Sequence, residues 1–514
     1  MKPTLFKLVK VNYSGERKKI MKIKIEINNA TSKISGLPRN VKSVINSHLA
    51  VKMPNYWFSP KYKQGLWDGT IKFFQYQTGM FPTGLLPRIL ELLEEVELTD
   101  YEIVDLRKDL KTFKVDPINY GYKIGEKTVR NYQVDAVNSV LTNSVNGRFY
   151  PRGIINIATN GGKTLIASVI LKQVYPKLVE QNKVFLFVTH SKEIAQQSKK
   201  SIEEILGEEV GFIGDGKWNV KPVTIAIITT LYSRKTKPEF LELTKDIVGY
   251  IGDECHHSKS TSWYEVFQLL ENAVYRVGLT GTVDDSNELN KTRLVCATGS
   301  VLTKVSNEFL IEQGFSARPI CVFFQVEKPE DLDELSYQDV YREGIVVNPH
   351  RAKLINLICT KETSRNNKVL ILVERVEHGL LLLENLNLPG KVVEFTHGGL
   401  DSAYRQEILE DLANGDIDVL ISTSILDEGV DVSNINAVVY ARGMKSDRKL
   451  LQGIGRGLRK KEDGSALRFY EFIDNTHDIL LNHSLQRYKT LRQENFEIKL
   501  FTPENYLITD LEEL

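Results

Sequence analysis

Short apolar runs alternate with stretches of helical spacing from about residue 150 to residue 475. Runs of this length are typical of buried strands, and their alternation with helical stretches is typical of parallel βαβ units. The runs form two series, separated by an acidic and polar connection at 327–339. We therefore predict an α/β protein with two tandem lobes, each built on a parallel sheet. The first series is 154–158, 184–189, 224–228, 250–253 and 275–279; the second is 369–373, 392–395, 419–422, 437–441 and 468–473.

The two ends of the chain have different patterns. Residues 21–27 alternate strictly between apolar and polar, and glycine and proline recur between residues 36 and 69, which predicts a small α+β domain. After about residue 478 the apolar positions have helical spacing, which predicts a helical tail packed on the second lobe. The expected domains are 1–115, 116–315, 316–480 and 481–514, with the start of translation at Met1 or Met21 left open.

Length and composition favour a protein of several domains. At 514 residues the chain exceeds the ~250–300 residues at which single cores stop growing. Hydrophobic residues make up 42% and charged residues 26%, as in ordinary soluble proteins. Four cysteines without a C-x-x-C pair argue against a zinc cluster and fit a reducing, cytoplasmic setting. Because no run approaches the ~18 apolar residues of a membrane span, we expect no membrane partner.

The charge is unevenly distributed along the chain. Residues 1–80 hold 15 Lys and Arg against 3 Asp and Glu, a balance of +12. Subtracting these from the totals of 67 and 66 leaves 52 against 63, or −11, for the rest. A basic first domain on a nearly neutral chain indicates a negatively charged partner.

Residues 158–164 (Ala-Thr-Asn-Gly-Gly-Lys-Thr) join a predicted strand to a predicted helix and resemble a phosphate-binding loop. Glycines let backbone N–H groups surround phosphates at a helix N-terminus, Lys163 adds positive charge, and Thr164 offers a hydroxyl to Mg²⁺. Ala158 replaces the first glycine of the usual G-x-x-x-x-G-K-[ST] pattern, and a plain Gly-rich turn is the alternative. We predict ATP and Mg²⁺ as cofactors, with nucleotide contacts from Thr159, Asn160, Gly161, Gly162, Lys163 and Thr164.

Two adjacent carboxylates, Asp253 and Glu254, end another apolar run. Asp253 can hold Mg²⁺, and Glu254 can orient or deprotonate the attacking water, which are the tasks that phosphoryl transfer leaves to the protein. Alone, such a pair is usually a solvated strand end; after a phosphate loop it supplies the missing positions. The adjoining Cys255, His256 and His257 have too few further ligands nearby for a metal site.

The sequence Asp253-Glu254-Cys255-His256 resembles the DExH box of superfamily 2 helicases, and other motifs follow in that family's order. The resemblance implies two RecA-like lobes that hydrolyse ATP and move along nucleic acid. By the same resemblance, Arg130 and Gln133 read adenine; His256, Thr280 and Thr282 couple hydrolysis to movement; and Thr189 and Thr230 contact the nucleic-acid backbone.

In the second series, residues 421–431 (Ile-Ser-Thr-Ser-Ile-Leu-Asp-Glu-Gly-Val-Asp) resemble motif V of the same family. This implies that Thr423 faces the bound strand, while Gly429 and Asp431 face the nucleotide. A strand followed by a glycine turn is the alternative.

Residues 452–459 (Gln-Gly-Ile-Gly-Arg-Gly-Leu-Arg) resemble motif VI, with Gly453 in place of the family's first arginine. By resemblance Gln452 contacts the nucleotide. Arg456 and Arg459 are three residues apart, so on a helix they share a face and can point together at the opposite lobe. They are candidate arginine fingers for the γ-phosphate, with solvated surface arginines as the alternative.

Residues 52–76 interleave aromatic and basic side chains. Lysines can neutralise phosphates, and aromatics can stack on exposed bases or wedge at a junction. Alternatively, the aromatics form the core of a small domain and the lysines are merely solvated. We expect mainly core aromatics and nucleic-acid-binding lysines. The aromatics are Trp57, Phe58, Trp67, Phe73 and Phe74, and the lysines are Lys61, Lys63 and Lys72.

This stretch, with residues 65–69 (Gly-Leu-Trp-Asp-Gly), 83–85 (Thr-Gly-Leu) and 341–351, is similar to the UvsW-type recombination helicases of tailed bacteriophages. The resemblance implies that the basic domain at 1–115 recognises double-stranded nucleic acid and that the enzyme migrates branches and remodels forks. A phage enzyme of this kind acts in the host cytoplasm.

The leading hypothesis is therefore an ATP-dependent DNA helicase or branch-migration motor that acts on forked or branched duplexes. An RNA helicase shares every motor motif and stays open as an alternative. A duplex-binding ATP switch that separates no strands is the third reading, and the complete hydrolytic set argues against it. Polarity, preferred junction and the strand-separating residue stay open, as does the oligomeric state, with a monomer favoured.

Overall fold

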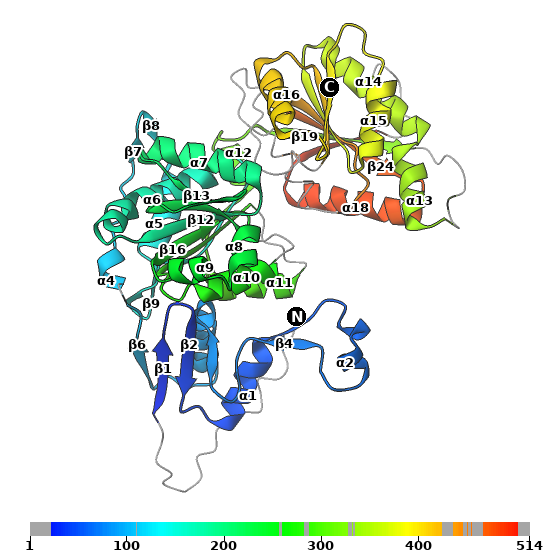
Figure 1. Cartoon of the computed structure of the whole chain (residues 1–514). Coiled ribbons are helices and arrows are strands. Elements are labelled where there is room, and N and C mark those ends of the chain that lie inside the picture. The colour runs from blue at the N-terminus through cyan, green and yellow to red at the C-terminus, as the bar shows by residue number, and fades with distance from the viewer. Residues whose placement is uncertain are drawn as a thin grey trace. The chain divides into compact units, whose positions relative to one another are not determined.

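The computed structural model describes residues 22–108, 110–255, 260–281, 287–326, 332, 335–423, 435–445, 450, 454 and 466–501. The chain forms two compact units. The first holds the chain up to Lys304 apart from residues 158–161, and the second holds those four residues and the chain from Val305 onward. Figure 1 shows the first unit from blue to green and the second from green to red.

A small α+β domain opens the first unit. Its elements are β1 (Ile23–Ile27), β2 (Thr31–Ser35), α1 (Arg39–His48), β3 (Ala50–Lys52), η1 (Tyr56–Phe58), α2 (Pro60–Lys63), β4 (Thr70–Lys72), β5 (Met80–Pro82), η2 (Thr83–Leu85), α3 (Leu86–Glu95) and β6 (Tyr101–Asp105). The sheet has the order β5-β2-β1-β6, in which β1 is parallel to β6 and antiparallel to β2. The alternation in β1 buries Ile23, Ile25 and Ile27 on one face, where α1 and α3 contribute to the same core. β3 and β4 form a separate hairpin.

The first lobe is built on an eight-stranded sheet with the order β14-β13-β15-β12-β16-β17-β11-β18. The strands from β13 to β11 are parallel to their neighbours, and β14 runs antiparallel to β13. The elements are α4 (Leu110–Phe113), β7 (Lys123–Ile124), β8 (Lys127–Thr128), α5 (Asn131–Leu141), β9 (Ser144–Val145), β10 (Arg148–Phe149), β11 (Arg152–Ile157), α6 (Lys163–Glu180), β12 (Val184–Thr189), α7 (Lys192–Leu206), β13 (Gly211–Gly214), β14 (Lys217–Asn219), β15 (Val223–Ile227), α8 (Ile228–Arg234), α9 (Pro238–Leu243), β16 (Ile247–Gly252), α10 (Ser260–Leu269), β17 (Tyr275–Thr280), α11 (Glu288–Ala297) and β18 (Val301–Val305).

The central strands of this lobe are apolar on both faces because helices cover both sides of the sheet. Every residue of β11, β12, β16 and β17 is buried. In β12, Leu186 and Val188 pack with helices α8, α9 and α10, while Phe185 and Phe187 alternate to the opposite face. Each large apolar side chain buried in this way contributes about 1.5–3 kcal/mol.

The small domain and the first lobe share one hydrophobic core. Leu289 and Cys296 of α11 and Tyr150 pack with the small domain's leucines and isoleucines. The Arg152 guanidinium, fully enclosed, donates to the Asn29 carbonyl of the small domain (2.8 Å) and to the Thr298 carbonyl of the lobe (2.9 Å). At Gly84 the two parts approach so closely that a Cβ would lie 1.9 Å from the Val295 carbonyl oxygen. The small domain is therefore fixed to the lobe rather than tethered to it.

The second lobe has a seven-stranded sheet, β21-β22-β20-β23-β24-β19-β25, in which all neighbours are parallel. Helices α14 and α15 pack on one face, and α16 and α18 on the other. The described elements are α12 (Asn307–Glu312), β19 (Pro319–Val326), α13 (Tyr337–Tyr341), the π-helical turn η3 (Arg342–Val346), α14 (Pro349–Ser364), β20 (Lys368–Leu372), α15 (Val376–Asn385), β21 (Val393–Thr396), α16 (Ser402–Asn414), β22 (Val419–Ser422), β23 (Ile435–Tyr440), β24 (Leu467–Asp474), α18 (Asp478–Gln493) and β25 (Glu497–Phe501).

These two parallel-sheet lobes and the small α+β domain confirm the predicted fold class. All ten predicted lobe strands are present, with ends shifted by a few residues. The tail differs from the prediction: α18 is followed by a strand, β25, that extends the sheet beside β19. The four expected domain boundaries stay predictions. In the described part of the chain, no helix has the length and apolar character needed to cross a membrane.

A buried histidine in the second lobe contributes to the response of the lobe to acid. His378 on α15 is 2% exposed, and its Nδ1 makes no hydrogen bond to any described residue. Burial, together with the positive charge of Arg351, lowers the pKa of His378 to about 3. The folded lobe therefore keeps this imidazole neutral, whereas the unfolded chain takes up a proton below the ordinary pKa of about 6.5.

We predict that this proton uptake by itself contributes a loss of stability of about 1.4 kcal/mol per pH unit as the pH falls from 6.5 toward 3. His378→Leu should flatten that loss, as measured by urea unfolding at pH 7, 5.5 and 4.5. Leu382→Ala, at a buried position of the same helix, should lower stability by about 2–5 kcal/mol equally at each pH. An unaltered pH slope in His378→Leu would refute the assignment.

Candidate active site

The candidate catalytic groups lie at one edge of the first sheet. Parallel strands end at the same edge, and β11, β17, β16 and β12 are consecutive neighbours there. Asn156 pairs with Thr280, Gly278 with Gly252, and Gly252 with Val188. The phosphate loop after β11 and the carboxylates after β16 therefore leave the same edge, one strand apart.

The phosphate loop turns sharply before α6. Asn160 (φ +68°) and Gly162 (φ +82°) adopt the left-handed conformation, which asparagine and glycine tolerate best. Gly162 caps α6, whose first residues are Lys163 and Thr164. The N–H groups of the first turn of a helix have no partner within the helix and are suited to binding an anion. The predicted strand, loop and helix thus follow one another as a phosphate loop requires.

Lys163 of the loop forms an ion pair with Glu254, the second carboxylate of the acidic pair. Both side chains are largely buried, with 14% and 17% exposure. Glu254 has a left-handed backbone (φ +47°), which is uncommon for glutamate, and its other carboxylate oxygen accepts from the Gly281 N–H at 3.5 Å. The structure therefore joins three segments that the sequence linked only by motif order.

Asp253 lies beside this pair and is buried, at 7% exposure. Its backbone N–H donates to the Val188 carbonyl (2.8 Å), and its carboxylate accepts from the Glu254 N–H (3.1 Å). Burial, reinforced by the negative charge of Glu254, raises the pKa of Asp253 to about 6, against the opposing effects of Lys163 and His190. A carboxylate that is costly to bury favours a bound cation as its counter-charge.

The donor set at this edge fits Mg²⁺. Mg²⁺ usually takes one or two carboxylates together with substrate phosphates and water. Asp253 supplies a buried carboxylate, and the Thr164 hydroxyl lies in the first turn of α6. These residues would hold the ion, which would neutralise charge on the phosphates.

The two residues expected to read adenine lie at the start of α5. The Arg130 N–H donates to the Gln133 side-chain oxygen (3.0 Å), which satisfies one backbone donor at the start of the helix. Gln133 is buried, and its Nε2 lies 2.4 Å from where a Cβ on Gly162 would stand. Because only glycine leaves that space, Gln133 packs directly on the phosphate loop.

The residues expected to couple hydrolysis or to contact nucleic acid lie in several places. Thr280 ends β17 and is fully buried. Thr189 ends β12 and is also fully buried, and its hydroxyl has no hydrogen bond to a described residue. Thr230 is half-buried on α8. In the second unit Thr423 follows β22, and its N–H donates to the Thr396 carbonyl (3.3 Å). Their roles stay predictions.

Several expected site residues lie outside the described residues, so their roles also stay predictions. They are His256 and Thr282 in the first lobe, and Gly429, Asp431, Gln452, Arg456 and Arg459 in the second.

Sequence reasoning missed a buried polar cluster that holds residues 441–444, the chain directly after β23. Arg351 donates to the Ala441 (3.2 Å) and Arg442 (3.4 Å) carbonyls, and Arg487 donates to the Met444 carbonyl (3.1 Å). Both arginines are fully buried, paired with Asp474 (3.0 Å) and Glu471 (2.8 Å), respectively. Since removing one partner of a buried ion pair is strongly destabilising, this strand end is held firmly. It leads, in sequence, to the segment with Gln452, Arg456 and Arg459.

The aromatic and basic stretch of the small domain divides into two parts. Phe73 and Phe74 are buried as expected, but Trp57 and Phe58 are 50% and 67% exposed. For these two residues the core interpretation is therefore wrong. The reason is local: they lie in η1, a short helix within the connection between β3 and β4, none of whose residues is buried. Lys61, Lys63 and Lys72 are exposed, and Trp67 is half-buried.

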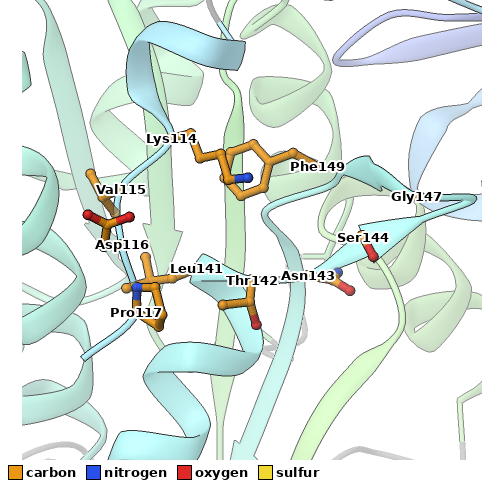
Figure 2. Close-up of a pocket in the computed structure, with 10 residues that line it drawn as sticks. All are labelled: Lys114, Val115, Asp116, Pro117, Leu141, Thr142, Asn143, Ser144, Gly147 and Phe149. Carbon is orange, nitrogen blue, oxygen red and sulfur yellow. The ribbon is translucent and has the colours of Figure 1, made fainter. Parts of the chain in front are cut away.

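A separate cavity of about 260 Å³ lies at the far end of α5 (Figure 2). It is lined by Leu141 and Thr142 at the C-terminal end of that helix, and by the segments around Lys114 and Phe149. Arg130 and Gln133 lie at the opposite end of α5, an 11-residue helix about 16 Å long. The cavity therefore does not belong to the nucleotide site.

Family models match three regions of the chain. Residues 28–105 match the description "DNA helicase UvsW, N-terminal", residues 126–285 match "Type III restriction enzyme, res subunit", and residues 349–461 match "Helicase conserved C-terminal domain". Among curated proteins, the chain is similar to the ATP-dependent DNA helicase uvsW of Enterobacteria phage T4. The two are 23% identical over 481 residues, which cover 87% of this chain and 92% of the relative.

Two solved helicases share the fold at low identity. The helicase MrfA bound to DNA and AMPPNP has a TM-score of 0.56 at 16% identity, covering 77% of this chain and 56% of MrfA. Dbp5 of S. cerevisiae bound to RNA and ADP BeF3 has a TM-score of 0.55 at 15% identity, covering 76% of this chain and 93% of Dbp5. The motif order, the three matched regions and the similarity to the phage T4 helicase together support a UvsW-like superfamily 2 helicase.

Proposed function

We propose that this chain is an ATP-dependent DNA helicase or translocase that unwinds or branch-migrates forked and branched DNA. The ion pair between Lys163 and Glu254 carries the proposal, because it joins the phosphate loop to the acidic pair at one sheet edge. An ATPase needs a phosphate-binding cation and a water-orienting carboxylate close together at the nucleotide. The UvsW family model on residues 28–105 supports DNA as the substrate.

In this proposal Lys163 exchanges partners during the cycle. Without nucleotide its ammonium is neutralised by Glu254. Incoming γ-phosphate competes for the ammonium, which releases the Glu254 carboxylate to orient the attacking water. Thr164 and Asp253 would hold Mg²⁺, which would neutralise charge on the phosphates, and Arg456 and Arg459 would stabilise the charge of the transition state. Glu254 is thereby available as a base only when ATP occupies the loop.

DNA is favoured over RNA by the small domain rather than by the motor. The lobes share their fold about equally with a DNA-bound and an RNA-bound helicase, at TM-scores of 0.56 and 0.55. The match with the relative named as a DNA helicase extends over 87% of this chain, which is more than the two lobes contain. The alternative of a duplex-binding ATP switch that separates no strands is less favoured, because such a switch would not need Glu254 as a base.

Removing the loop cation tests the hydrolytic assignment. We predict that Lys163→Ala lowers ATP turnover by about 10²–10³-fold or more, because phosphate charge in the transition state loses its counter-ion. Phosphate release measured with saturating DNA reports the effect. Lys245→Ala, an exposed lysine at the opposite end of β16, should turn over at the wild-type rate. Normal turnover in Lys163→Ala would refute the site.

Arg456→Ala tests the proposed arginine finger. We predict that ATP binding, measured with a fluorescent analogue, is retained while turnover falls by about 10³–10⁵-fold, since the charge acts mainly in the transition state. The matched control is Arg492→Ala on α18, an exposed arginine whose loss should change neither quantity. If Arg456→Ala hydrolysed ATP normally, the arginine would be a surface residue.

The substrate is tested by comparing ATP hydrolysis with single-stranded DNA, linear duplex, a four-way junction and single-stranded RNA. Salt must be fixed, because phosphate contacts depend on it. We expect the junction to stimulate most. Equal or greater stimulation by RNA would make RNA remodelling the better account, and no stimulation by any nucleic acid would favour the ATP switch.

A further inference from the structure

An arm projects from the small domain. Residues 53–69, which we call the arm, connect β3 to β4 and carry the short helices η1 and α2 (Figure 1). Hairpin connections usually have 2–5 residues. A connection much longer than this in a compact domain is usually a functional loop.

The surface of the arm combines exposed apolar groups with positive charge. Trp57, Phe58 and Leu66 are at least half exposed, with Leu66 at 75%. Lys61 and Lys63 are exposed on α2, and neither forms an ion pair within the described part of the chain. Aromatic side chains left in water on a projecting element mark an interaction site.

The one acidic residue of the arm is already engaged. The Asp68 carboxylate accepts from the Thr70 N–H (2.9 Å) and Thr70 hydroxyl (2.6 Å), and it pairs with Lys72 (3.3 Å). These hydrogen bonds lower the pKa of Asp68 to about 2. Asp68 therefore serves the base of the arm, and the outer part presents net positive charge to a partner.

The base of the arm, around Tyr56, has a defined internal packing. Tyr56 lies edge-on to Trp57 and Tyr62, with ring centroids 5.2 and 4.7 Å apart, and Lys52 Nζ lies 4.4 Å from the Tyr56 ring centroid. Gly69 has a left-handed backbone (φ +78°), and a Cβ at this position would lie only 2.4 Å from the Cδ2 atom of the Tyr56 ring. The ring therefore packs directly on the glycine. Trp57 and Phe58 are thus held outward by a packed base.

The arm is also anchored to the motor. Phe73, directly after β4, is buried and packs edge-on against Tyr264 of α10, with ring centroids 6.3 Å apart. Val51 of β3 belongs to the same hydrophobic core as Leu289 of α11. A force that acts on Trp57 and Phe58 therefore reaches the first lobe through packed side chains.

We propose that Trp57 and Phe58 form the strand-separating element, stacking on bases at a DNA branch point while Lys61 and Lys63 hold the adjacent phosphates. The inference rests on the proposed function. Lysines alone would suit a duplex backbone, and stacking aromatics alone would suit a single strand. Both together fit the point where paired strands part, because only there do duplex phosphates and unstacked bases adjoin.

The first test needs no ATP. Full-length protein is mixed with a forked DNA that carries the fluorescent base 2-aminopurine either at the branch point or inside the duplex, away from the branch point. The wild type should raise the fluorescence of the branch-point probe only. Trp57→Ala/Phe58→Ala should lose most of that rise, whereas the conservative Trp57→Phe should retain it. If the double variant raised the fluorescence of the branch-point probe as much as the wild type does, the proposal would be overturned.

The second test compares unwinding with hydrolysis. In Trp57→Ala/Phe58→Ala the number of base pairs opened per ATP hydrolysed should fall by about tenfold or more, as expected for the loss of a stacked base. The matched control is Tyr404→Ala, an exposed aromatic on α16, which should keep the wild-type ratio. A proportional loss of both activities would reduce the arm to general DNA binding and overturn strand separation.

A third measurement addresses another occupant. If the exposed tip were a contact between two copies of the chain, light scattering would show a dimer that the double variant loses, which would overturn the DNA assignment. A monomer in both proteins supports it. Since the 2-aminopurine test needs no hydrolysis, it still decides on the arm if the wild type hydrolyses no ATP, a result that would overturn the proposed function instead.

Discussion

The direction of the strands is the constraint on which the site depends. Because β11, β17, β16 and β12 are parallel neighbours, their carboxyl ends and the loops that follow reach one edge of the sheet. The hydrogen-bonded register brings Thr280 and Asp253 to that edge with the phosphate loop. The ion pair between Lys163 and Glu254, 91 residues apart in sequence, follows from this arrangement.

Much of this could be predicted from the sequence, because the strands of a parallel sheet are apolar throughout and end in recognisable loops. The missed strands show the limit. β19 and β25 pair with each other although 170 residues lie between Val326 and Glu497. No local pattern encodes that pairing. Likewise, the aromatic sequence at 56–58 is the same whether its rings are buried or exposed; the outcome depends on where the β3–β4 hairpin lies.

The second lobe combines its apolar cores with buried ion pairs. Arg351 and Arg487 are fully enclosed and spend their donors on carboxylates and on the carbonyls of residues 441–444. Desolvating such groups is costly unless every donor has a partner, so the geometry around them is narrowly defined. Residues 441–444 are thereby held in place ahead of the segment predicted to contact the nucleotide. The sequence did not reveal this, because an arginine on a helix usually faces solvent.

The shared core of the small domain and the first lobe bears on how such a protein can evolve. Arg152 joins carbonyls from both parts, and Tyr150 donates to the Thr83 carbonyl. Separating the small domain from the first lobe would leave the buried guanidinium of Arg152 without one of its hydrogen-bond acceptors and would expose an apolar surface. The small domain is therefore not an exchangeable module: a lineage that recombined it onto another motor would have to carry the matching face of α11 along. New substrate preferences should instead arise by changing the arm, which can vary without disturbing that joint.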